Sequence, residues 1–180
     1  MRRTRIGLAG VAAGALVITA VPASGEARAV AADAPPPAPA CTNAGTRAQV
    51  YDTDLGGMSH RAIMIALTNT STLSCDVRGY PALRMLDAGH QAITPQSVRN
   101  GATYFSGDPG VRTIRLSPGE GVSALLVWGN LDGATTARPS FLEVGVPGTD
   151  ISQVVAWSPD AVANGDLNVT ALARHIPIEH

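Results

Sequence analysis

Two methionines and a histidine form the most distinctive group of possible ligands in the sequence. Met58, His60 and Met64 supply two thioethers and an imidazole, and this combination is suited to copper. Alternation along the chain predicts that Met64 points into the core, so the pair left over is Met58 and His60. We expect no metal site, and copper handling centred on Met58 and His60 is the alternative.

Catalytic groups are sparse. The histidines are His60, His90, His175 and His180, and no serine stands in a G-x-S-x-G turn. A nucleophilic enzyme needs a nucleophile with a base beside it, and the absence of lysine removes Schiff-base and Ser-Lys chemistry. We therefore predict no catalytic residue, no cofactor and no enzymatic activity. An enzyme with an unrecognised site is a further alternative.

The paired acids Asp52 and Asp54 could begin a calcium loop. Such a loop needs a bidentate glutamate at its twelfth position, which this sequence lacks. We predict a solvated strand end there instead.

The N-terminus has the pattern of an export signal. Three arginines among the first five residues precede an uncharged, largely apolar run over residues 6–21, which is shorter than the ~20 residues of a membrane span. Ala27-Arg28-Ala29 matches the A-x-A cleavage pattern, and cleavage after Ala23 competes with it. We predict a signal peptide over residues 1–29, cleaved after Ala29, and a secreted protein, extracellular or associated with the cell wall, without a stable membrane span.

Charge argues against a nucleic-acid partner. Without residues 1–29 the chain carries nine arginines and thirteen acidic residues. Nucleic-acid binders present a basic face to the phosphates, and this composition offers none. The expected partner is an unknown cell-envelope component or an extracellular ligand.

A linker and one β domain make up the rest of the chain. Residues 30–40 hold four prolines and predict an extended Pro/Ala-rich spacer. From Cys41 to Pro177, short apolar runs alternate with turn residues, which predicts an all-β fold, an antiparallel immunoglobulin-like β-sandwich of about eight strands. The predicted strands are 47–53, 61–69, 82–87, 112–116, 122–128, 141–146, 153–157 and 167–172.

One of these strands and one connection between strands allow further predictions. Residues 122–128 are apolar on both faces, which is typical of a central strand. The 23-residue connection from Ala88 to Gly110 is long for a sandwich and could hold an edge strand near 103–105. It carries Tyr104 and Phe105, which either pack beneath the loop or form a recognition loop.

The two cysteines, Cys41 and Cys75, are predicted to form a disulfide. An exported chain meets an oxidising compartment, and two cysteines allow one intramolecular pairing. The strands over 47–53 and 61–69 run out and back, so they return the chain to the end of the sandwich where it began. A reactive thiol and metal ligation are the competing uses.

Several of these motifs resemble one family. They are Asn69-Thr70-Ser71, Cys75, Gly79-Tyr80-Pro81, Leu86-Asp87-Ala88-Gly89, Leu116-Ser117-Pro118-Gly119, Trp128, Leu142-Glu143-Val144 and Val146-Pro147-Gly148. Together they resemble domain-of-unknown-function family 4232, found in secreted proteins and lipoproteins of high-GC Gram-positive bacteria. The resemblance implies an extracytoplasmic β-sandwich with no established activity. It also implies a second, C-terminal cysteine pair in many members, which this chain lacks.

Three function classes follow from these observations. The favoured one is a secreted, non-catalytic module of the cell envelope that binds a partner. The others are the copper-handling module and the enzyme with an unrecognised site.

Overall fold

The computed structural model describes residues 37–131, 136–150 and 153–179. The predicted signal peptide, its cleavage site at Ala29 and the first part of the linker lie outside the described residues.

The last residues of the linker predicted over 30–40 make backbone contacts with the domain. Ala40 forms a parallel bridge with Asp76, and the Pro39 carbonyl accepts a hydrogen bond from the Asp76 amide at 2.8 Å. The last linker residues therefore join the domain.

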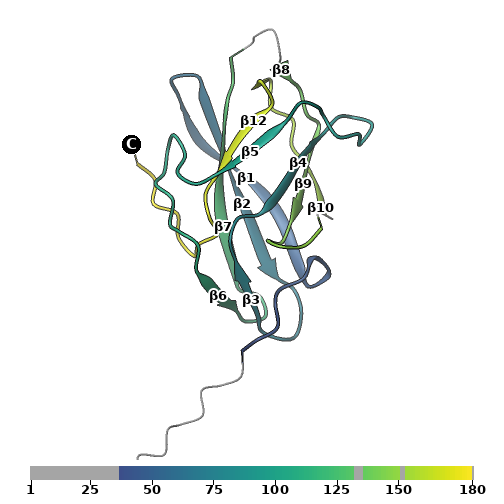
Figure 1. Ribbon diagram of the computed structural model, residues 1–180, viewed down its shortest axis with the longest axis vertical. Helices are drawn as coiled ribbons and strands as arrows, with labels where there is room; N and C mark the ends of the chain where they lie inside the picture. Colours follow the sequence, from purple (N-terminus) through teal and green to yellow (C-terminus); the bar gives the residue numbers. More distant parts are fainter. Residues whose placement is uncertain (1–36, 132–135, 151–152, 180) are drawn as a thin grey trace, which may run out of the picture. The chain divides into compact units, whose positions relative to one another are not determined.

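A five-stranded sheet forms one layer of the domain (Figure 1). Its strands are, in spatial order, β1 (Thr46–Gly57), β2 (His60–Asn69), β7 (Gly121–Gly129), β12 (Asp166–Val169) and β5 (Ser97–Asn100). All neighbours are antiparallel except β12 and β5, which run parallel. β7 is thus the central strand, as its two apolar faces predicted.

Smaller sheets complete the fold (Figure 1). β10 (Gln153–Ala156), β9 (Phe141–Gly145) and β4 (Ala82–Leu86) form a three-stranded sheet. β3 (Cys75–Arg78) pairs with β6 (Thr113–Leu116), and β8 (Thr136–Ala137) with β11 (Val162–Ala163). The described residues include one 3₁₀ turn, Asn43–Gly45, and no helix long and apolar enough to cross a membrane.

The first hydrophobic core lies between the five-stranded and three-stranded sheets. Alternate residues along each strand point into it, because successive side chains of a strand face opposite sides. Trp128 and Trp157 meet edge to face there, with ring centroids 5.1 Å apart. The buried strand residues of this core include Ile63, Ile65, Leu67, Leu83, Met85, Val122, Leu126, Leu142 and Val144.

A second core covers the opposite face of β7. Leu125 and Val127 point to that side and are fully buried. They pack with Phe105 from the loop over residues 101–110 and with Ala173 and Ile176 near the C-terminus. The chain after β12 stays attached to β7, since Ser123 and Ala173 exchange two backbone hydrogen bonds of 2.8 and 2.9 Å. We call the loop 101–110 and residues 170–179 together the covering segments.

The eight predicted strands are all present, and the all-β fold is confirmed. The described residues form four further short strands that the sequence did not predict, β3, β5, β8 and β11. The edge strand predicted near 103–105 is wrong, because the strand in this connection is β5 at Ser97–Asn100.

The Asn164-Gly165 turn explains the position of β5. Both residues have positive φ, 55° and 69°, and a Cβ at Gly165 would lie 2.3 Å from the Pro95 carbonyl oxygen. Glycine therefore lets the chain before β5 approach the start of β12 closely.

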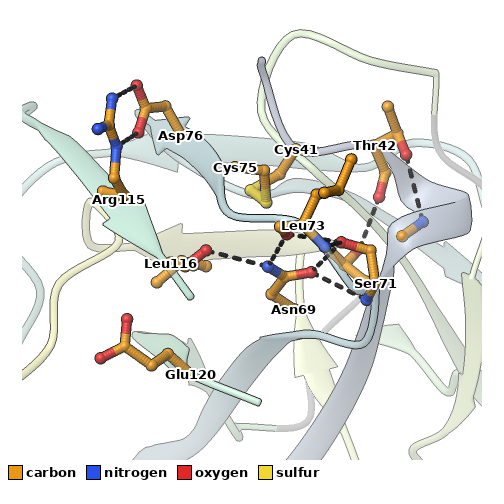
Figure 2. The surroundings of a disulfide bond; sticks show 12 residues. Cys41, Thr42, Asn69, Ser71, Leu73, Cys75, Asp76, Arg115, Leu116 and Glu120 are labelled. Carbon is orange, nitrogen blue, oxygen red and sulfur yellow. Dashed lines mark hydrogen bonds and ion pairs between the residues drawn. A yellow bond between two sulfur atoms is a disulfide. The ribbon is translucent and has the colours of Figure 1, made fainter. Parts of the chain in front are cut away.

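The predicted disulfide is present between Cys41 and Cys75. Beside it lies the fully buried side chain of Asn69 (Figure 2). Its amide nitrogen donates to the carbonyls of Leu73 and Leu116 at 2.8 and 3.0 Å, and its oxygen accepts from the Ser71 amide and hydroxyl at 3.0 and 2.7 Å. A buried amide with all its hydrogen bonds made holds the turn after β2 against the end of β6.

Reducing the disulfide should destabilise the domain. The bridge closes a loop between residues 34 positions apart, which is worth about 3–4 kcal/mol in the chain-entropy model. The measurement is chemical denaturation of the oxidised and reduced protein, with thiols counted under denaturing, non-reducing conditions. Two free thiols in the protein purified without reductant, or equal stabilities of the two forms, would contradict the prediction.

Candidate functional site

The turn between β1 and β2 presents an imidazole beside an aromatic ring. Met58 and Ser59 both have positive φ, 45° and 64°, which makes the hairpin turn tight. The next residue, His60, stacks its ring on that of Tyr104 with centroids 4.3 Å apart and planes 3° apart. Its Nδ1 lies 3.0 Å from the Met58 carbonyl oxygen. The stack therefore joins the hairpin turn to the covering loop 101–110.

The structure gives Tyr104 and Phe105 different environments. Phe105 is 8% exposed and belongs to the second core, whereas Tyr104 is 51% exposed. The two rings meet edge to face with centroids 4.9 Å apart. One of the two predicted recognition residues is therefore an anchor of the loop, and the other is available to a partner.

A hollow of about 790 Å³ lies beside these rings. It is open to solvent and is lined by Thr53, Asp54, Leu55 and Gly56 of β1, by Tyr104 and Phe105, and by Glu179. Glu179 is held there by its amide, which donates to the Phe105 carbonyl at 2.8 Å. The hollow thus combines aromatic edges with two carboxylates. We call the surface formed by His60, Tyr104 and this hollow the tyrosine surface.

The possible copper ligands are divided between two environments. Met58 is 81% exposed in the hairpin turn next to His60, whereas Met64 is partly buried against the second core. Among the residues that the structure describes, no group of three His, Cys, Asp or Glu is placed to hold a metal ion. The copper hypothesis therefore depends on Met58 and His60 alone.

The other two described histidines, His90 and His175, lie away from the tyrosine surface lining. His90 lies in the connection after β4, with its ring 4.2 Å from that of Phe141, and His175 is exposed near the C-terminus. Within the described ranges, no histidine nitrogen is hydrogen-bonded to a carboxylate or a hydroxyl.

A partly buried hydrogen-bond network centred on Asp108 attaches the covering segments to the sandwich. The Tyr80 hydroxyl donates to Asp108 Oδ2 at 2.7 Å, and the Ala171 amide donates to Asp108 Oδ1 at 2.9 Å. The Leu172 amide also donates to the Gly79 carbonyl at 2.9 Å. Asp108 thus ties the covering loop to the connection between β3 and β4 and to the chain after β12. The hydrogen bond to Asp108, followed by burial, raises the pKa of Tyr80.

Comparison with known proteins identifies the family. The sequence model of the family described as Domain of unknown function (DUF4232) matches residues 41–173. The chain belongs to the DUF4232 family. No curated protein and no solved structure matches it.

Sequence reasoning missed the roles of two residues in this DUF4232 domain. Tyr80 was noted only within Gly79-Tyr80-Pro81, and Asn69 only within a turn. The signal that could have found them is a polar residue next to predicted buried strands, where an unpaired group would be costly. Asp108, the partner of Tyr80, and Leu116, the distant partner of Asn69, lie 28 and 47 positions away, and no local pattern identifies these two.

The Tyr80 hydroxyl should make the stability of the domain sensitive to alkaline pH. Because its pKa is raised in the folded protein, its contribution is fully present below the ordinary tyrosine pKa of about 10. The contribution is lost as pH rises through the folded value. Tyr80→Phe should cost about 1 kcal/mol near neutral pH, as expected for one hydrogen bond, and should reduce the loss of stability above pH ~10.

Urea denaturation at several pH values measures both effects. Tyr51→Phe is the control, because Tyr51 is exposed on β1 and makes no hydrogen bond through its hydroxyl to the described chain. Equal pH dependence in the wild type and Tyr80→Phe would show that the Tyr80–Asp108 bond does not contribute.

Proposed function

We propose that this DUF4232 domain is a secreted, non-catalytic binding module of the cell envelope, and that the tyrosine surface contacts its partner. The observation that carries the proposal is that the Tyr104 ring is both exposed and fixed in place. The ring is half exposed, yet it is stacked on His60 and held edge to face by the buried Phe105.

An exposed ring that is already fixed is favourable for binding. A partner that packs on a mobile side chain must first restrict it, which costs about 0.5–1.5 kcal/mol per side chain. Tyrosine also offers a large apolar area with a hydroxyl at its tip. Because Tyr104 is held on both sides before any partner arrives, most of this cost is already met within the fold.

The hollow next to Tyr104 indicates what the partner presents. Asp54 and Glu179 line it, and ionised carboxylates only accept hydrogen bonds. A complementary partner therefore carries hydroxyl, amide or ammonium donors opposite the hollow and an apolar face opposite the ring. Cell-envelope glycans and peptides both offer such groups.

The secreted location rests on the sequence. The arginine-rich start, the apolar run and Ala27-Arg28-Ala29 favour export, and the Cys41–Cys75 disulfide is typical of an oxidising compartment. The family description assigns no ligand.

Copper handling is the second candidate, and one observation favours it. Met58 and His60 lie in the same exposed turn, with the Met58 thioether freely accessible. His60 Nδ1 is engaged by the Met58 carbonyl, which leaves Nε2 as the metal-binding nitrogen. Stoichiometric copper binding that His60→Ala abolishes would favour this candidate over a partner-binding surface.

The binding proposal is tested by co-sedimentation of the secreted protein with purified cell wall of the producing bacterium. Tyr104→Ser should reduce the bound fraction about tenfold, the loss expected when a contact residue of moderate importance is truncated. Its stability should fall by only about 1–2 kcal/mol, because the half-exposed ring loses its contacts with His60 and Phe105 while the cores stay intact.

The matched control is Val154→Ser, which changes a similarly exposed side chain on β10 of the three-stranded sheet. It should bind as the wild type does. Wild-type protein that does not sediment with the wall, or Tyr104→Ser protein that sediments as well as Val154→Ser, would contradict the proposal.

A further inference from the structure

A second hollow, at the β3–β6 end of the domain, is lined by three arginines and a histidine together with two prolines, a threonine and an isoleucine. Its volume is about 690 Å³. Arg112 and Arg115 line it from the segment that forms β6, and Arg174 and His175 line it from the covering segment near the C-terminus. We call it the arginine hollow. It shares no lining residue with the hollow of the tyrosine surface.

Two of its three arginines are held in place by carboxylates. Arg115 donates from Nε and Nη2 to the two oxygens of Asp76 at 3.0 and 3.3 Å, as Figure 2 shows. Arg174 donates from Nη1 and Nη2 to the two oxygens of Glu120 at 3.3 and 3.2 Å. Paired contacts of this kind fix the plane of a guanidinium as well as its position.

The carboxylates are themselves anchored. Asp76 follows Cys75 of the disulfide directly and lies on β3, opposite Arg115 of β6. Glu120 accepts a hydrogen bond from the Ser117 amide at 2.8 Å. That bond, together with Arg174, holds the pKa of Glu120 below its usual value. Arg174 Nη2 also donates to the Arg115 carbonyl at 2.7 Å, which ties the two walls of the hollow together.

Arg112 differs from the other two. It is exposed and makes no hydrogen bond or ion pair with any part of the chain that the structure describes. Three guanidinium groups therefore face two carboxylates. A guanidinium has five N–H donors, so Arg115 and Arg174 keep donors that their carboxylates do not use.

We propose that the arginine hollow is a phosphate-binding site, with Arg112 as the principal contact and Arg115 and Arg174 as pre-positioned supporting donors. Phosphate suits the hollow because its several oxygens can bridge donors that converge from different segments, and guanidinium matches its geometry. The occupant is a phosphate group, whether free, part of a phosphodiester polymer of the envelope or a lipid headgroup. This inference is independent of the proposed role of Tyr104.

The test measures binding of three probes to the secreted protein at one ionic strength. The probes are inorganic phosphate, poly(glycerol phosphate) and vesicles containing phosphatidylglycerol. NMR should show phosphate-dependent shifts at the Thr113, Arg115 and His175 amides. Arg112→Ala should raise the Kd for poly(glycerol phosphate) about tenfold, which equals about 1.4 kcal/mol. Added salt should weaken binding, because an exposed charge contact is screened.

The matched control is Arg47→Ala, which removes an exposed arginine of β1 that does not line the hollow and has no partner in the described chain. Both variants lower the net charge equally, so a difference between them reports the site and not overall charge. Binding of the polymer or of the vesicles that only Arg112→Ala weakens supports the proposal and tells which phosphate source is held. Absence of binding to all three probes, or equal weakening by Arg112→Ala and Arg47→Ala, overturns it.

Discussion

The domain is built around the need to bury both faces of β7. A strand that is apolar on one face is satisfied by a single opposing sheet. β7 carries Leu126 and Trp128 toward the three-stranded sheet and Leu125 and Val127 away from it, and all four are buried. The second face must therefore be covered as well, and here the cover is chain outside the named strands. The covering segments meet this requirement through Phe105, Ala173 and Ile176.

The covering segments also contribute residues to both candidate binding surfaces, the tyrosine surface and the arginine hollow. Burying Phe105 brings its neighbour Tyr104 to the His60 ring, and the chain that buries Ile176 places Arg174 and His175 opposite β6. Asp108 connects the two covering segments to each other and to Tyr80. Residues with possible roles in binding are thus positioned by packing elsewhere, as is usual for loops on a rigid sandwich.

Local patterns in the sequence located eight of the described strands, but neither the short strands β3, β5, β8 and β11 nor the segments that cover β7. Alternation and turn residues located the eight main strands, and the double apolar face of residues 122–128 identified the central one. The length of the connection over 88–110 led us to expect an edge strand near 103–105, whereas the strand lies at Ser97–Asn100. In the folded protein Phe105 is instead buried in the second core, and residues 103–105 form no strand. The arginine hollow was not predicted, because only folding brings Arg112 and Arg174 to the same hollow. Their spacing in the sequence does not indicate a shared site.

Native-state hydrogen exchange tests most directly whether the covering segments belong to the same cooperative unit as β7. The amides to compare are those of Leu126 in β7 and of Ala173 and Glu179, which donate to Ser123 and Phe105. We expect Ala173 to exchange with the same opening free energy as Leu126, and Glu179 to approach it, because exposing Leu125 and Val127 requires global unfolding. Rapid exchange at Ala173 while β7 stays fully protected would contradict the account, since the second face of β7 would then not need its cover.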